Sequence, residues 1–123
     1  MTKNWDKKSR IRKSQDFRKI QRKGKKWKSS DFLFLFLPSN KTSRIGLVVS
    51  KKVGNAVIRN LVKRRLREAC RKNLEILKNN VDIVIIAFSS AALCTQKTVE
   101  NQVIKAFSGI SKKSVTIRKI RDY

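Results

Sequence analysis

A glycine-containing loop that runs into a two-faced helix constrains this chain more than any other segment. The loop ends in Gly54-Asn55, and residues 56–73 contain neither glycine nor proline. At about 100° per residue, the apolar side chains of 56–73 gather on one side of a helix. That side is expected to face a core, and it consists of Ile58, Val62, Leu66 and Ala69, with Leu61 and Cys70 at its flanks. The helix therefore needs a second layer that covers its apolar face.

The other side of the same helix is basic. It is formed by Asn60, Lys63, Arg64, Arg67 and Arg71, with Arg59 at its border. Only Glu68 offers local neutralisation, so like charges repel one another at helical spacing. A mixed Lys/Glu face would indicate ordinary solvated surface, whereas an almost acid-free one favours a polyanion partner. Arginine suits phosphate because its planar guanidinium binds two oxygens in a fixed geometry.

The net charge supports the same partner class. The chain has 32 basic and 8 acidic residues in 123, a formal net charge of +24. The charge is concentrated in residues 1–28 (+11), 51–73 (+8) and 101–123 (+5), and nearly neutral apolar segments separate these blocks. Such a charge repels itself unless a polyanion neutralises it. Nucleic acid is the first candidate partner and an acidic membrane surface the second. A hydrophobic content of 40% argues against a disordered basic tail.

Several kinds of chemistry are disfavoured by composition. Histidine is absent, and Cys70 and Cys94 have no CxxC spacing, so a zinc site is not predicted. The cysteines are interpreted as buried thiols rather than as a disulfide. The acidic residues are scattered, so no catalytic residue and no metal ligand is predicted. Because there is no signal-peptide pattern and no apolar run long enough to cross a bilayer, a soluble cytoplasmic protein is expected.

Hydrophobic periodicity predicts a single domain of the α+β or α/β class over residues 1–123. The expected elements are a helix over 14–22, strands over 31–37, 44–50 and 81–88, a final helix beginning at Thr95, and either an edge strand or a basic tail over 114–123. The strands 31–37 and 44–50 are expected to form an antiparallel hairpin. The continuous apolar run of 81–88 is typical of a buried central strand. The architecture is thus one mixed sheet with about three helices. The segments 1–9 and 112–123 are expected to be flexible basic ends.

The basic helix and its loop resemble a known signature. Lys51 to Val57, followed by Arg59-Asn60, Lys63-Arg64 and Arg67-Glu68, is similar to the signature of the bacterial ribonuclease P protein subunit. The resemblance extends to Arg12–Phe17, Gly24, Phe32, Gly46–Ser50, Asp82–Ala87 and the helix over 95–107, and so covers about residues 10–108.

The resemblance implies a fold and a function. It implies an α/β sandwich with a four-stranded mixed sheet and a left-handed βαβ crossover, as in a ribosomal-protein-like domain. It implies that the protein binds the catalytic RNA of ribonuclease P and the single-stranded 5′ leader of precursor tRNA. The RNA would perform the Mg²⁺-dependent hydrolysis that releases the leader, and the protein itself would bind no cofactor. No membrane and no protein partner is implied.

The resemblance also assigns residues. On the matching positions, the catalytic RNA would be contacted by Arg59, Asn60, Lys63, Arg64 and Arg67. The leader-binding cleft would be lined by Phe17, Leu35, Lys51 and Lys52. From the sequence alone, Phe17 fits core packing better than base stacking, and Gly54-Asn55 fits an ordinary loop better than an anion site.

One departure from the family pattern lies in the basic helix. The family commonly has arginine directly after Arg-Asn and an apolar residue four positions later, whereas this chain has Leu61 and Arg65. Because the two positions are one turn apart on the same side of a helix, we interpret the cation as moved by one turn rather than lost.

A second departure concerns the leader cleft. The family often has a second aromatic residue one turn after Phe17 and a tyrosine in the following strand, whereas this chain has Gln21 and Leu35. We therefore expect weaker leader discrimination and more reliance on charge.

Two other functions fit parts of the sequence. A ribosomal or ribosome-assembly protein would be equally basic, and co-purification with ribosomal RNA would distinguish it. A self-sufficient nuclease would need clustered carboxylates to hold metal ions, and the eight acidic residues show no such cluster in the sequence.

Overall fold

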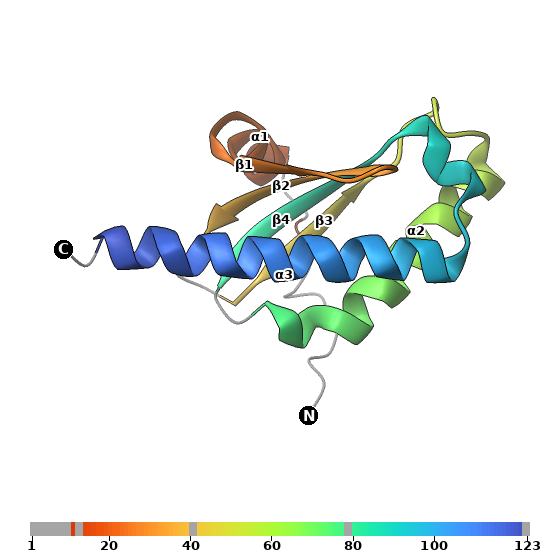
Figure 1. Cartoon of the computed structure of the whole chain (residues 1–123). Helices are drawn as coiled ribbons and strands as arrows, with labels where there is room; N and C mark the ends of the chain where they lie inside the picture. Colours follow the sequence, from red (N-terminus) through yellow and green to blue (C-terminus); the bar gives the residue numbers. More distant parts are fainter. Residues whose placement is uncertain (1–10, 12–13, 40–41, 78–79, 122–123) are drawn as a thin grey trace.

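The computed structural model describes residue 11 and residues 14–39, 42–77 and 80–121. In chain order the elements are α1 (Ser14–Lys23), β1 (Lys25–Lys28), β2 (Phe32–Pro38), β3 (Arg44–Val48), α2 (Ala56–Asn73), η2 (Leu74–Ile76), β4 (Val81–Ala87), η3 (Ser89–Leu93) and α3 (Gln96–Arg121). Figure 1 shows α3 crossing one side of the sheet with α2 next to it, and α1 on the other side. The predicted α+β class, with three α-helices and one mixed four-stranded sheet in the described residues, is confirmed.

The order of strands in the sheet is β1-β2-β4-β3. Strand β4 pairs antiparallel with β2 and parallel with β3. The predicted hairpin between 31–37 and 44–50 is therefore wrong, because β4 lies between these two strands. Apart from Asp82, every residue of β4 is apolar, and only a central position covers both of its faces. The connection β3–α2–β4 is a βαβ crossover, and its left-handed sense stays a prediction.

The fourth strand is not the one expected. Strand β1 pairs antiparallel with β2 from Lys25↔Phe36 to Lys28↔Leu33, so the hairpin of this fold is β1–β2. The sequence pattern misses β1 because three of its four residues are lysines. Residues 114–121, expected as an edge strand or a basic tail, instead continue α3, because no glycine or proline after Gly109 interrupts it. The expectation for residues 1–9 lies outside the described residues.

One face of the sheet, called here the phenylalanine face, is closed by α2 and α3. Phe32, Phe34 and Phe36 are fully buried on it. The helices contribute Val62 and Leu66 from α2, and the predicted stripe of α3, namely Val99, Val103, Ala106, Phe107 and Ile110, is buried as well. This face therefore forms the main hydrophobic core.

The other face, called here the leucine face, carries Leu33, Leu35 and Leu37 of β2 and is covered by the short helix α1. Ile20 of α1 packs there with Leu35 and Val84, while Leu33 and Leu37 stay half-buried. α1 ends where expected: the N–H of Gly24 donates to the carbonyl of Ile20 (2.8 Å), and a Cβ at Gly24 would lie 2.4 Å from that oxygen.

An ion network also fixes α1 to the leucine face. Arg44 of β3 donates to both carboxylate oxygens of Asp82 on β4 (3.1 and 2.9 Å) and to Asp16 of α1 (3.2 Å). These bonds raise the pKa of Arg44 above its ordinary value, the hydrogen bonds to Asp82 contributing most. One guanidinium therefore joins two strands and a helix.

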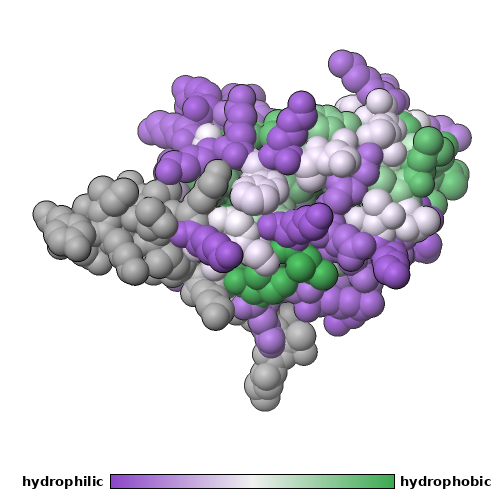
Figure 2. Space-filling model, viewed as in Figure 1, coloured by the Kyte–Doolittle hydropathy of each residue, from purple (hydrophilic) through white to green (hydrophobic). Residues whose placement is uncertain are grey.

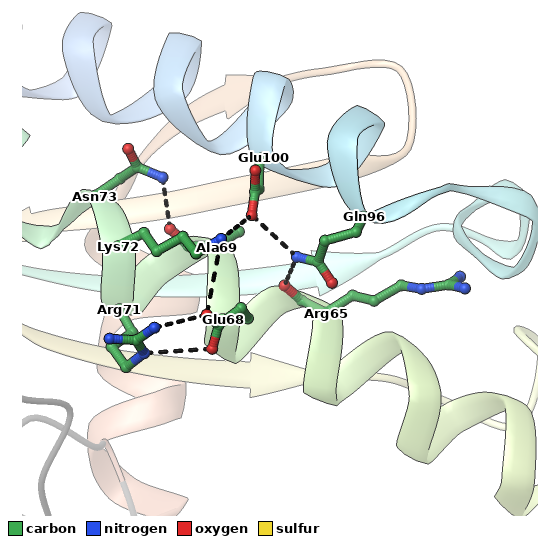
Figure 3. Close-up of polar contacts among 8 residues, drawn as sticks. All are labelled: Arg65, Glu68, Ala69, Arg71, Lys72, Asn73, Gln96 and Glu100. Atoms are coloured by element: carbon green, nitrogen blue, oxygen red, sulfur yellow. Dashed lines mark hydrogen bonds and ion pairs between the residues drawn. The ribbon is translucent and has the colours of Figure 1, made fainter.

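Helices α2 and α3 are joined by a polar network (Figure 3). Lys72 pairs with Glu68 on its own helix (3.8 Å) and with Glu100 on α3 (3.3 Å). Gln96 donates to the backbone carbonyl of Arg65 (3.0 Å). These contacts fix the position of α2, and with it the direction in which its basic side points.

Candidate nucleic-acid interface

Helix α2 has the orientation that the sequence predicts. Val62, Leu66, Ala69 and Cys70 are buried against the core. On the opposite side Asn60, Arg64, Arg67 and Arg71 are exposed, and Arg59 and Lys63 are half-buried. The helix begins after Asn55, whose side-chain oxygen accepts from the N–H of Ile58 (3.0 Å). Gly54 precedes this cap, and a Cβ there would lie within 3.1 Å of three atoms of the Ile58 side chain.

The basic side divides into a paired and an unpaired part. Glu68 accepts from Arg71 (2.6 Å) and pairs with Lys72, so the C-terminal cations are partly neutralised. The unpaired part, called here the basic stripe, consists of Arg59, Asn60, Lys63, Arg64 and Arg67. Among the described residues, no cation of the stripe has an acidic partner within 4.0 Å. The stripe therefore presents uncompensated positive charge.

Arg59 adds a specific indication. In the part of the chain that the structure describes, its Nε is buried and has no hydrogen-bond partner. Buried donors are nearly always paired in folded proteins. A phosphate oxygen could pair with this nitrogen only after the Arg59 side chain moves outward, because the atom is buried in the structure.

A pocket of about 160 Å³ lies at the edge strand β3 and is called here the β3-edge pocket. It is lined by Ile11, Phe17, Ile45, Gly46, Leu47, Lys63 and Arg67. The aromatic ring of Phe17 comes from α1, and the two cations come from the basic stripe. An apolar ring and two cations thus border one opening, an arrangement that suits a nucleotide with its base on the ring side.

The structure separates the other predicted cleft residues from this pocket. Leu35 is 3% exposed and lies under α1 with Ile20 and Val84. Its prediction as a residue that contacts the leader is wrong, because α1 covers it. Lys51 and Lys52 are exposed in the turn before α2, beyond the pocket lining. They stay predicted contacts from that turn.

Arg65 has a different role from the one interpreted above. Its guanidinium donates to the backbone carbonyl of Cys94, which follows η3. The cation therefore holds the turn after η3 against α2, a role that the interpretation above did not include. Sequence patterns could not find this contact because Cys94 is 29 residues away.

The cysteines and acids are arranged as structural groups. Cys70 and Cys94 are both buried and unbridged. Burial and the neighbouring Asp31 raise the pKa of the Cys94 thiol to about 12. Within the described ranges no three Cys, Asp or Glu side chains are grouped closely enough to hold a metal ion. In the same ranges no helix is both long and apolar enough to cross a membrane.

Fold and site together define a small basic α+β domain whose one helix and adjacent pocket are suited to RNA. Residues 5–111 match the family model for ribonuclease P. The chain is 41% identical over 100 residues to the ribonuclease P protein component of Clostridium novyi, covering 79% of this chain and 88% of that protein. It is 39% identical over 110 residues to that of Exiguobacterium sibiricum, covering 86% and 95%.

Solved structures agree. The ribonuclease P protein of Staphylococcus aureus superposes with a TM-score of 0.75 at 32% identity, covering 85% of this chain and 95% of that one. The protein from Thermotoga maritima gives 0.74 at 31% identity, covering 80% and 94%. The chain belongs to the bacterial ribonuclease P protein family, the protein components of a ribonucleoprotein endoribonuclease.

Proposed function

We propose that the chain binds the catalytic RNA of ribonuclease P through the basic stripe and the 5′ leader of precursor tRNA at the β3-edge pocket. In this proposal the RNA hydrolyses the phosphodiester bond with Mg²⁺, and the protein supplies binding and orientation in the cytoplasm. The ribosomal alternative is not favoured, because the family match covers residues 5–111.

One observation carries the proposal: Lys63 and Arg67 belong both to the basic stripe and to the lining of the β3-edge pocket. An RNA that follows the stripe is therefore next to the opening bordered by Phe17. A catalytic RNA and a leader bound on these two adjacent surfaces would meet at one boundary. That arrangement would bring the 5′ end of the substrate to the RNA that cleaves it.

The pocket has one aromatic wall. Gln21, one turn after Phe17, is exposed on α1, and Leu35 is covered. We therefore expect the leader to be held by one stacked base and by phosphate contacts. Sequence preference in the leader would then be weak, and affinity would fall steeply with salt because each neutralised phosphate releases counterions.

The test is leader release from a precursor tRNA by a bacterial ribonuclease P RNA at low magnesium, with and without the protein. Rescue of cleavage supports the proposal, whereas RNA binding without rescue contradicts it.

Arg64→Ala should weaken binding of the catalytic RNA and lower the slope of log affinity against log salt by about 1. Lys97→Ala, an exposed lysine at the start of α3, is the matched control and should change neither. Loss of thermal stability in Arg64→Ala with intact binding would contradict the assignment of the stripe.

A further inference from the structure

A tryptophan on the edge strand β1 lies on the opposite side of the sheet from α1. Trp27 pairs with Phe34 in the register of β1 and β2, so its side chain is on the phenylalanine face. It packs against α3 at Gly109, where a Cβ would lie only 2.1 Å from Cζ3 of the indole. Because real Cβ atoms do not approach this closely, a glycine is needed for the ring to lie against the helix backbone. The contact fixes the ring in place while leaving it half-exposed.

Two hollows adjoin this ring, and together they are called here the Trp27 groove. One has a volume of about 530 Å³ and is lined by Trp27, Ile104, Lys105, Ser108, Gly109 and Lys112. The other has a volume of about 330 Å³ and is lined by Trp27, Lys28, Ser29, Ser30, Gln102 and Lys105. Ile104 is 39% exposed there although it is a large apolar residue. Figure 2, viewed from the α3 side, shows pale and green residues over the middle of α3 bordered by purple ones.

The groove is separate from the RNA site proposed above. It lies at the β1 edge, and the β3-edge pocket lies at the opposite edge of the sheet. No residue lines both. An RNA segment on the basic stripe therefore leaves the Trp27 groove open.

We propose that the Trp27 groove is a second RNA site, which takes an unpaired segment with a base against the indole and Ile104. The lysines that border the two hollows, Lys28, Lys105 and Lys112, would bind the flanking phosphates. The charge is complementary to a polyanion, and the apolar wall distinguishes this groove from a site for simple anions. Bases of a duplex are stacked within the helix and cannot reach such a wall, so the occupant is single-stranded.

Tryptophan emission tests this proposal directly. The chain has two tryptophans, so Trp5→Phe leaves Trp27 as the sole emitter. A short oligoadenylate should quench its emission in a saturable way, because a stacked base contacts the ring. An abasic oligonucleotide with the same number of phosphates should bind, by fluorescence anisotropy of an attached dye, without this quenching. Equal quenching by both oligonucleotides would overturn the proposal, since it would show a response to charge alone.

Two variants separate this groove from the basic stripe. In the same background, Lys105→Ala should weaken the affinity measured by quenching roughly threefold or more, as expected for loss of one phosphate contact. Lys97→Ala removes a lysine of the same helix outside the groove and should leave that affinity unchanged. Arg64→Ala/Arg67→Ala should keep the quenching while losing affinity for the catalytic RNA. Loss of quenching in that double variant, with unchanged thermal denaturation, would place the signal at the stripe and refute a second site.

Discussion

The two faces of the sheet differ in how they are closed. On the phenylalanine face, two helices cover three buried aromatic rings, and the core continues without interruption from β2 to α3. On the leucine face, the ten-residue helix α1 covers only part of the surface, and the side chains of Leu33, Leu37, Val48 and Ile86 stay half-buried. The phenylalanine face therefore supplies most of the stability, and the leucine face is covered only in part.

The sequence already contains the cause of this difference. Strand β2 alternates phenylalanine and leucine, so the larger side chains all point to one side. The rings are covered by α2 and α3, whereas the leucines on the other side are covered only in part by α1. The Arg44 ion network holds α1 on the leucine face.

The largest effect is expected from a cavity in the closed face. Phe34→Ala removes a ring that contacts both Phe32 and Phe107 edge to face at 6.5 Å, and it should lower the free energy of unfolding by about 3–5 kcal/mol. Leu33 is the preceding residue and lies on the leucine face, where it is only half-buried. Leu33→Ala should therefore lower the free energy of unfolding by only about 1–2 kcal/mol. Urea denaturation followed by circular dichroism measures both. If Phe34→Ala does not fold, Phe34→Leu gives a smaller loss in the same order, and equal losses on the two faces would contradict the comparison.

The second-largest loss of stability is expected from breaking the Arg44 ion network that holds α1. Arg44→Ala leaves Asp82, whose side chain is 13% exposed, without its bidentate partner, and a loss of about 1–3 kcal/mol is expected. Hydrogen exchange should show α1 losing protection before α3 does, because only α1 is attached through Asp16. Arg71→Ala breaks an exposed pair on α2 and is the control, for which a smaller loss is expected. Uniform loss of protection across all helices would show that Arg44 stabilises the whole fold rather than α1.

Local patterns predicted the helices and three of the strands, but not their pairing. The bounds of α2, its two faces and the buried stripe of α3 follow from helical periodicity, which each segment carries by itself. Strand β1 has almost no apolar pattern and exists because its backbone pairs with β2. The position of β4 between β2 and β3 is decided by which strand gains most from burial on both faces, and that is a property of the whole sheet.

In the candidate site, too, features carried by one element were predictable, whereas contacts between distant elements were not. The basic stripe was predictable because its residues lie at helical spacing on one element. The β3-edge pocket was only half predictable, since Phe17 meets Lys63 and Arg67 across the edge of the sheet. Arg65 was misread because its partner, the Cys94 carbonyl, comes from a distant turn. Every residue has a backbone carbonyl, so an acceptor of this kind cannot be recognised from the sequence.

A third effect should change function more than stability. A Cβ at Gly46 would lie 2.7 Å from two atoms at the far end of the Phe17 ring and 3.2 Å from Cβ of Ile11. Gly46→Ala should therefore displace the ring from the β3-edge pocket at little loss of stability. We expect roughly threefold to tenfold weaker binding of precursor tRNA with a leader, part of the contribution of one stacked base, and unchanged binding of mature tRNA. Gln21→Phe adds a second ring one turn along α1 and should strengthen leader binding. If neither variant alters leader affinity, Phe17 serves the packing of α1 alone.

The smallest effect concerns the hydrogen bond between Asp31 and Gln102 of α3, whose strength depends on pH. The carboxylate of Asp31 accepts from the Cys94 thiol (3.0 Å) and from Gln102 of α3 (2.7 Å). Hydrogen bonding from Cys94 above all, then from Ser90 and Gln102, lowers the pKa of Asp31 below its ordinary value of 3.8. Because the folded state holds the ionised form, this contribution is complete above pH 3.8 and is lost as pH falls through the lowered value. Asp31→Asn should therefore be less stable than the parent near neutrality and should lose less stability as pH falls below 3.8. Glu75→Gln, a change of an exposed acid of η2, should follow the parent. Parallel curves for the parent and Asp31→Asn would mean that the network holds α3 by geometry and not by the charge of Asp31.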